Sequence, residues 1–245
     1  NVNQSSANDV AWNWKANGAG SLNEVGSIDS TVSVNTTSGF SIVKYTGDTS
    51  AATVGHGLGV VPKMIILKNI SAVNSWFVYH HDLGATKYMV LDTTAAEAAA
   101  ASIWNDTTPT STVFSVGTTN AVSGNDFIAY CFADVKGYSK IGTYIGNGNV
   151  DAPFVYTGFK PSYILVKKTT QTDRWQIRDN ARDTYNLANH YLCANVSTAE
   201  TVGDGMDYLS NGFKYRASSG EVNASGQTYI YMAFASEPLV ANVGA

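Results

Sequence analysis

The fold is indicated by Gly59-Val60-Val61-Pro62-Lys63-Met64-Ile65-Ile66-Leu67-Lys68, in which a proline precedes a continuous apolar run. The pattern recurs 99 positions later as Gly158-Phe159-Lys160-Pro161-Ser162-Tyr163-Ile164-Leu165-Val166-Lys167. Proline has no backbone N–H and is tolerated at the first residue of a strand, so each apolar run is interpreted as a buried strand. A segment that recurs at a fixed period indicates one structural unit used more than once.

Further matches flank this stretch and extend the repeat over most of the chain. They join Tyr45 with Tyr144, Trp76 with Trp175, Phe114 with Phe213, and residues 128–133 with 230–235. One unit therefore covers residues 39–136, and a second covers residues 137–245 together with a C-terminal tail.

The first residues match the end of a unit. Residues 2–5 and 10–15 align without gaps to residues 222–225 and 230–235. We therefore expect residues 1–38 to hold the end of a truncated preceding repeat and a linker. On this hypothesis the chain is the C-terminal part of a longer repeat-built polypeptide. Trp12 and Trp14 would then lie in a core strand.

Each unit has about six short strands with turn residues between them, a pattern typical of a sandwich or barrel. In the first unit the expected strands are residues 40–46, 64–69, 76–80, 87–91, 112–116 and 127–133. The sequence thus predicts an all-β protein with two tandem antiparallel β-sandwich units, jelly-roll-like and about 100 residues each.

One short helix is expected in each unit. Thr94-x-x-Glu97 and Ser197-x-x-Glu200 have the spacing of a capping box, in which the two side chains satisfy backbone N–H groups at a helix start. Ala98–Ala101 follows the first box and favours helix, whereas Val202-Gly203 follows the second and would end a helix early.

Composition excludes several classes of protein. The chain has 245 residues, of which 44% are hydrophobic and 14% charged, with a net charge of −4. An apolar content of this size argues against disorder. The charges form no basic stripe, so we expect no nucleic-acid partner. The apolar runs are far shorter than the roughly 18 residues of a membrane helix, so we expect no membrane insertion.

The two cysteines, Cys131 and Cys193, lie in apolar surroundings and are interpreted as inert core thiols, with a long-range disulfide as the alternative. His80-His81-Asp82 is the densest group of metal-ligating residues. Adjacent side chains of a strand point to opposite faces, so this group is not expected to bind a metal. Carboxylate spacing indicates no glycosidase pair. We predict a protein without catalytic residues or cofactors.

Candidate binding residues come from the places where the two copies differ in length. Surface loops on a rigid scaffold commonly carry recognition. The first copy has about four extra residues around Trp104, and the second has its own excess between Trp175 and Tyr191. The candidate contact residues are Trp104, Asn105 and Asp106 in the first loop and Arg182, Tyr185 and His190 in the second.

Several of these stretches resemble a repeat unit of bacteriophage tail-fibre and tail-appendage proteins of the environmental or marine type. The resemblance rests on residues 39–47, 54–66, 84–88 and 229–235, followed by Glu237-Pro238. It implies a virion tail component, extracellular, that forms a homotrimer, contacts other phage tail proteins, and attaches to a host glycan or outer-membrane protein. It carries over no catalytic or receptor-binding residue.

Three other functions fit the same residues. A purely structural shaft or collar segment would have the same low charge and the same polar surface. A polysaccharide depolymerase would need a pair of catalytic carboxylates. A bacterial secreted adhesin of similar repeat design would differ only in its source.

Overall fold

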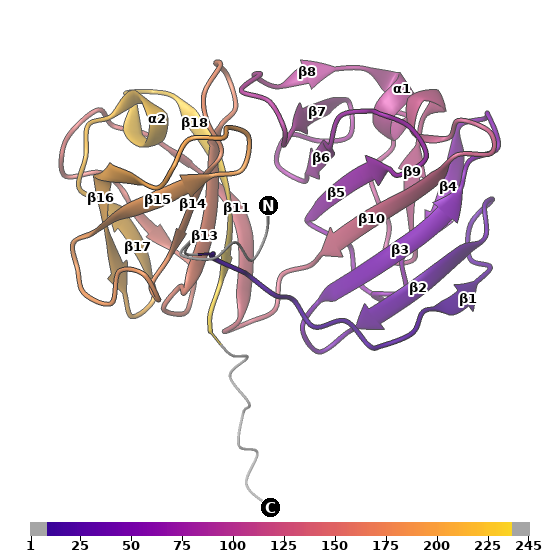
Figure 1. Cartoon of the computed structure of the whole chain (residues 1–245), viewed down its shortest axis with the longest axis horizontal. Helices are drawn as coiled ribbons and strands as arrows, with labels where there is room; N and C mark the ends of the chain where they lie inside the picture. The colour runs from indigo at the N-terminus through magenta and orange to yellow at the C-terminus, as the bar shows by residue number, and fades with distance from the viewer. Residues whose placement is uncertain (1–8, 237–245) are drawn as a thin grey trace, which may run out of the picture.

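The computed structural model describes residues 9–236 and shows an all-β protein with two lobes lying side by side (Figure 1). The matches at residues 2–5 and the C-terminal tail at 237–245 lie outside the described residues. Within the described residues, the strands form two eight-stranded sheets, one in each lobe, and a two-stranded sheet in the first lobe. No helix in this part of the chain is long and apolar enough to cross a membrane.

The first lobe contains a sheet with the strand order β1-β2-β3-β10-β5-β6-β7-β8, and β4 pairs separately with β9. The strands are β1 (Ser21–Asn23), β2 (Ser30–Asn35), β3 (Phe40–Thr46), β4 (Ala52–Gly55), β5 (Met64–Asn69), β6 (Phe77–His80), β7 (Lys87–Val90), β8 (Ala98–Ala99), β9 (Val113–Val116) and β10 (Asp126–Phe132). All six strands expected in the first unit are present, with bounds that differ by one residue at most.

The second lobe contains a sheet with the order β11-β18-β13-β14-β15-β16-β17-β12. Its strands are β11 (Ser139–Ile145), β12 (Phe154–Tyr156), β13 (Tyr163–Lys168), β14 (Gln176–Asp179), β15 (Ala188–Cys193), β16 (Thr201–Leu209), β17 (Gly212–Tyr215) and β18 (Thr228–Phe234).

The central strands of the two sheets have the same neighbours. The order β3-β10-β5-β6-β7 in the first lobe corresponds to β11-β18-β13-β14-β15 in the second. The register corresponds too. Phe132 is paired with Phe40 and Met64, and its sequence match Phe234 is paired with the corresponding residues of β11 and β13.

These central strands are covered on both faces, which explains their continuous apolar sequences. In β10, Phe127, Ala129 and Cys131 point into the core of the first lobe, where they meet the β4–β9 pair. Tyr130 and Phe132 point the other way and belong to a separate apolar cluster. In β18, Tyr229, Tyr231 and Ala233 likewise face the core of the second lobe.

The separate cluster lies at the junction of the two lobes. Its buried members come from both sheets: Phe40, Met64, Ile66, Val78, Met89 and Phe132 from the first lobe and Ile141, Leu165, Trp175, Ile177, Ile230, Met232 and Phe234 from the second. The rings of Phe132 and Phe234 meet edge to face, with centroids 5.9 Å apart. The two sheets therefore pack against each other through their outer faces.

The helices lie elsewhere than the capping boxes predict. The α-helices are α1 (Ala101–Trp104) and α2 (Gly220–Asn223), and η1 (Thr118–Asn120) is a 3₁₀ turn. Ala98 and Ala99 form β8, paired with β7, and the second box is followed by β16. The glutamates of both boxes are engaged in ion pairs instead, Glu97 with Lys87 and Glu200 with Arg182, so tertiary contacts override the local signal.

Both cysteines are free. Cys131 is fully buried, and burial raises the pKa of its thiol to about 12. Cys193 is half-buried, and burial raises the pKa of its thiol as well. Cys131 is thus the inert core thiol that its sequence predicts, because a thiol reacts as the thiolate.

Tyr45 in the first lobe and Tyr144 in the second occupy matching sequence positions and make the same buried hydrogen bond. The Tyr45 hydroxyl donates to the Asn120 carbonyl at 2.7 Å, and the Tyr144 hydroxyl donates to the Val222 carbonyl at 2.7 Å.

We expect Tyr144→Phe to lower the free energy of unfolding by about 1–3 kcal/mol in urea titrations, because a buried carbonyl loses its donor. The exposed Tyr156→Phe is the control, and equal stabilities of the two variants would contradict this role.

Candidate binding site at the lobe junction

The N-terminal segment, residues 9–17, passes between the lobes without forming a strand. This differs from the expected core strand because β10 and β18 already occupy the equivalent place in each sheet. Trp12 and Trp14 are half-buried and anchor the segment to the junction cluster. The Trp14 ring lies edge-on to Phe132, Tyr163 and Phe234, with centroids 5.9, 5.2 and 5.5 Å away.

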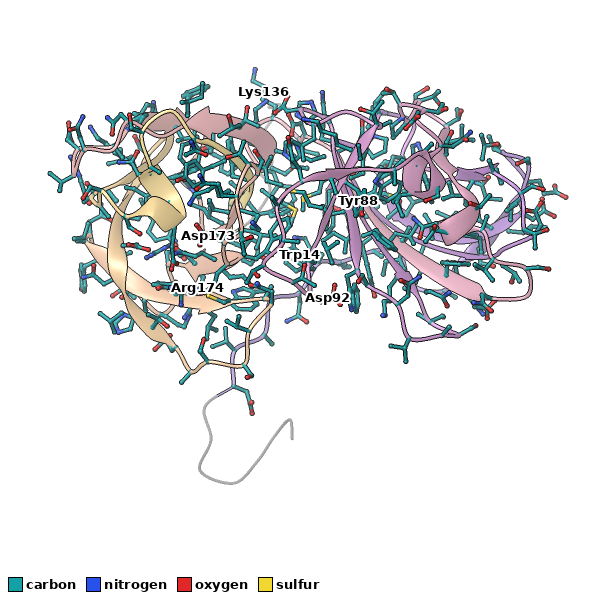
Figure 2. All side chains as sticks on the ribbon, turned by 90° about the horizontal axis from the view of Figure 1, so that it is seen from above. Trp14, Tyr88, Asp92, Lys136, Asp173 and Arg174 are labelled. Atoms are coloured by element: carbon teal, nitrogen blue, oxygen red, sulfur yellow. The ribbon has the colours of Figure 1, made fainter. Side chains whose placement is uncertain are left out.

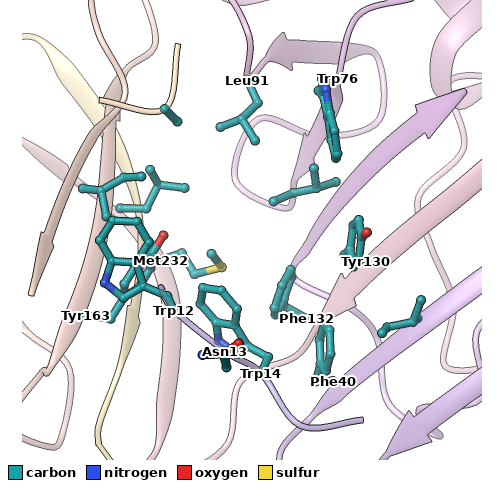
Figure 3. A pocket seen from close by; sticks show the side chains of 15 residues that line it. Trp12, Asn13, Trp14, Phe40, Trp76, Leu91, Tyr130, Phe132, Tyr163 and Met232 are labelled. Atoms are coloured by element: carbon teal, nitrogen blue, oxygen red, sulfur yellow. The ribbon is translucent and has the colours of Figure 1, made fainter. Parts of the chain in front are cut away.

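Beside this segment the two sheets leave an apolar cleft of about 380 Å³ (Figure 3). Trp12 and Trp14 line one end, and Trp76 and Leu91 line the other. Tyr130 and Tyr163 come from the two facing sheets. The cleft is thus formed by both lobes together with the N-terminal segment.

Arg182 lines a separate, polar cleft and also contacts Trp12. The Arg182 Nε donates to Asp179 Oδ2 at 2.7 Å, and its Nη1 donates to Glu200 Oε1 at 2.5 Å. The guanidinium lies 5.9 Å from the centroid of the Trp12 ring, and the Trp12 indole N–H donates to Asp179 at 3.3 Å. One arginine therefore joins two carboxylates and an aromatic ring, through both hydrogen bonds and a cation–π contact.

His190 lines the same polar cleft and is held by Asp183. The Nδ1 of His190 lies 2.7 Å from one carboxylate oxygen of Asp183, and its backbone N–H donates to the other at 2.7 Å. Partial burial acts to raise the pKa of Asp183, but these hydrogen bonds outweigh it and hold the pKa below its usual value. The cleft has a volume of about 840 Å³ and is lined by Asp9, Val10, Arg182, His190, Leu192, Ala199 and Glu200.

The second candidate loop is only partly gathered into this site. Arg182 and His190 both line the polar cleft. Tyr185 is highly exposed, at 84%, and is not among the residues that line the cleft. The polar cleft can offer a ligand carboxylates, an imidazole and a guanidinium.

The first candidate loop does not present its tryptophan. Trp104 is only 2% exposed and packs against Tyr79 in the core of the first lobe, with centroids 5.9 Å apart. The extra residues of this copy form α1, which turns the indole of Trp104 inward. The greater length of this loop therefore does not mean that its tryptophan is exposed. Asn105 and Asp106 are exposed. The structure does not bring this loop to the polar cleft.

Sequence reasoning missed three residues of the junction site. The sequence pattern predicts a strand at Trp12 and does not single out Asp179 or Glu200 as binding residues. The sequence does distinguish Trp12 from the full copies, because the matching positions there are Tyr130 and Met232. For Glu200 the capping-box pattern predicts a helix start, whereas the side chain forms an ion pair with Arg182.

His80, His81 and Asp82 have ligand atoms within 4.8 Å of one another. The two imidazoles stack, with centroids 5.2 Å apart, because β6 ends at His80 and His81 begins a turn. The expectation that they point to opposite faces is therefore wrong. His80 Nδ1 accepts the Asp82 N–H at 3.2 Å, and the Lys63 ammonium lies 3.5 Å from His81 Nδ1. The Lys63 ammonium beside His81 disfavours a bound cation.

A family model described as Domain of unknown function (DUF7483) matches residues 1–238, which include the N-terminal segment and both lobes. The chain belongs to this family. No curated protein matches the DUF7483 chain, and no solved structure matches it.

If Arg182 holds the N-terminal segment of the DUF7483 chain in place, Arg182→Met should release it. We expect faster tryptic cleavage after Lys15, measured by mass spectrometry, because Trp12 loses its cation–π partner and Asp179 loses its ion pair. Arg216→Met is the matched control. Arg216 directly follows β17 and also forms ion pairs with two carboxylates, those of Asp151 and Asp207. Cleavage after Lys15 at an unchanged rate would contradict this anchoring.

The burial of His80 leads us to predict that acid destabilises the fold. Burial, and the charge of the neighbouring His81, lower the pKa of His80 to about 3. The unfolded chain, with an ordinary pKa of 6.5, then binds the proton more tightly, so stability is full above pH 6.5 and falls as the pH drops towards 3. We expect a loss on the order of 3 kcal/mol between pH 7 and pH 4.

The test is a series of urea titrations across this pH range for the native chain and for His80→Asn. The asparagine amide can still accept the Asp82 N–H but has no proton to bind, so its stability should depend less on pH. Parallel curves for the two proteins would show that another group carries the acid sensitivity.

Proposed function

We propose that this DUF7483 chain is a non-enzymatic part of a bacteriophage tail fibre that binds a host-surface glycan in the polar cleft around Arg182. In this proposal the chain acts in the virion, outside the cell, as a homotrimer held by other tail proteins. The resemblance of its repeat stretches to tail-fibre units supports the setting. The contents of the cleft support a glycan over an outer-membrane protein.

The observation that carries the proposal is the arrangement of Arg182, His190 and Glu200 around one cleft, with the Trp12 ring against the Arg182 guanidinium beside it. Specific sites combine an apolar or aromatic surface with a few polar groups that fix orientation. Sugars have this dual character, because their C–H faces pack on aromatic rings and their hydroxyls bond to charged groups. Glu200 and Asp183 supply further acceptors beside the cleft, already oriented by Arg182 and His190.

We also propose that the two lobes are two jelly-roll-like β-sandwich copies of one unit, residues 39–136 and 137–245, preceded by the end of another copy in residues 1–38. The equal order of the central strands supports this division. So does the pairing of Phe132 and Phe234 with corresponding residues in the two sheets.

The experiment is saturable binding of the labelled protein to a panel of bacteria and to their purified surface polysaccharides, scored against phage adsorption. We expect His190→Ala to weaken binding by roughly tenfold, the equivalent of about 1.4 kcal/mol for a lost hydrogen bond to a polar ligand. Asp106→Ala, in the loop of the first lobe, is the matched control and should bind as the native chain does.

Three outcomes would overturn the proposal. The absence of saturable binding on a panel that contains the host would assign the chain to a shaft or collar. Release of reducing sugar from a bound polysaccharide would indicate a depolymerase. Loss of binding in Asp106→Ala with native binding in His190→Ala would move the site to the first lobe.

A further inference from the structure

Each of the two large sheets ends, on the side away from the other lobe, in a strand with one neighbour. In the second sheet this strand is β12, which pairs with β17, and in the first sheet it is β1, which pairs with β2. Figure 1 places β17 and β1 towards opposite ends of the long axis of the molecule. The outer edge of a terminal strand presents backbone N–H and C=O groups that can pair with another chain.

The β12 edge carries two exposed aromatic residues. Phe154 is 44% exposed and Tyr156 is 64% exposed, and both point away from the core that Val155 enters. Thr157 N donates to the Asn211 carbonyl, so Val155 and Thr157 belong to the hydrogen-bonded pairs of this antiparallel ladder. The backbone groups of Phe154 and Tyr156 therefore point away from β17. Exposed aromatic residues beside free backbone groups are typical of a contact surface.

The equivalent edge of the first lobe, in β4, is covered by residues 23–28. β4 and β12 pair with β9 and β17 in corresponding registers, and the two aromatic positions are Thr53 and Gly55 there. The Thr53 carbonyl accepts from two backbone N–H groups of the covering segment, at 3.0 and 3.1 Å. A side chain at Gly55 would strike the same segment. This fold thus covers such an edge with the stretch of chain around the end of β1.

The outer side of that stretch is itself exposed and offers a place for an aromatic ring. Leu22 is 67% exposed and Val25 is 50% exposed. Leu22 lines a groove of about 210 Å³, together with Asp29 and Thr31. A tyrosine has an apolar ring and a polar tip, so it suits a groove with an aliphatic wall beside a carboxylate and a hydroxyl.

The two edges carry opposite charges. Glu24 and Asp29 are exposed beside β1, and neither forms an ion pair in the part of the chain that the structure describes. Lys160, four residues after Tyr156, is exposed as well and forms no ion pair among residues 9–236. Complementary charge guides association and fixes its register. The β12 edge of one molecule is therefore matched to the β1 edge of another.

The position of the two edges relative to each other is fixed by the lobe junction. Side chains of both lobes meet there around Trp14 (Figure 2). Backbone and side-chain hydrogen bonds join the lobes as well. Asp173 N donates to the Thr94 carbonyl at 2.8 Å, and the Trp175 indole N–H donates to the Val90 carbonyl at 2.9 Å. The lobes cover each other within one chain, which leaves the outer edges for contacts between copies.

We propose that copies of this chain dock head to tail, with the β12 edge of one copy against the β1 edge of the next. In this contact Tyr156 enters the Leu22 groove, and Lys160 faces Glu24. The two surfaces differ, so the contact is heterologous and can close into a ring. A ring of three is the homotrimer of the proposed function, on which this inference rests only for the number of copies.

The first test is sedimentation velocity of the native chain, Tyr156→Asp and Leu22→Asp over a range of concentrations. We expect the native chain to associate, and each variant to have a dissociation constant at least roughly tenfold higher, because a charge replaces an apolar anchor of the contact. Val73→Asp is the matched control, since Val73 is a fully exposed valine of the β5–β6 loop. It should associate as the native chain does.

Mixing the two variants tests the head-to-tail arrangement. Each variant keeps one native edge, so equal amounts should form a heterodimer and no larger assembly. A native chain that is monomeric at every concentration, or a mixture that stays monomeric, would overturn the proposal. Undiminished association of Leu22→Asp would mean that β12 pairs with β12 of a second copy, and would overturn it too.

Further measurements separate this proposal from the proposed function. Equal melting temperatures of Tyr156→Asp, Leu22→Asp and Val73→Asp would show that the fold is kept. A native assembly of a number of copies other than three would overturn the homotrimer and, with the heterodimer formed on mixing, still support the head-to-tail contact. Glycan binding depends on Arg182 and His190 and can be measured on the monomeric variants, so each proposal can fail without the other.

Discussion

The rest of the structure depends on the burial of both faces of the central strands. In β10, Phe127 and Cys131 face the core of the first lobe while Phe132 faces the second lobe, and β18 repeats this division. Removing apolar surface from water contributes about 25 cal/mol per Å², so a strand covered twice contributes to two cores at once. The lobes are therefore joined by packing as well as by the chain between residues 132 and 139, and the junction becomes a rigid place on which to hold the N-terminal segment.

The two lobes differ most where the candidate site lies. In β6 the inward residues are Phe77 and Tyr79, but in β14 the matching positions are Gln176 and Arg178. Arg178 is 1% exposed, and its guanidinium lies 4.9 Å from the Tyr191 ring centroid and donates to the Gly203 carbonyl at 3.0 Å. A buried charge needs such partners, because an unpaired one is strongly destabilising. The second lobe thus has a polar interior directly beneath the strand end that carries Asp179, and this network fixes β14, β15 and β16 around the polar cleft.

The strands were predictable and the junction was not. Continuous apolar runs after Pro62 and Pro161 indicate strands buried on both faces, but they do not say what covers the second face. The helix prediction failed because Glu97 and Glu200 are drawn into ion pairs with residues distant along the chain, which no local pattern reveals. Trp104 was expected to be exposed because its loop is longer than the matching one, yet loop length carries no information on the direction of a side chain. Of the six candidate residues, Arg182 and His190 share a cleft because both lie beside the end of β14, an adjacency set by strand pairing.

The packing of the two outer faces is tested most directly by a double-mutant cycle on Phe132 and Phe234. The unfolding free energies of Phe132→Ala, Phe234→Ala and the double variant would be measured in urea against the native chain. The account predicts a favourable coupling of about 0.5–1.5 kcal/mol, the range for an edge-to-face aromatic pair. Losses that add within about 0.3–0.5 kcal/mol would mean that the two rings do not interact, and would contradict a junction built from the outer faces of the sheets.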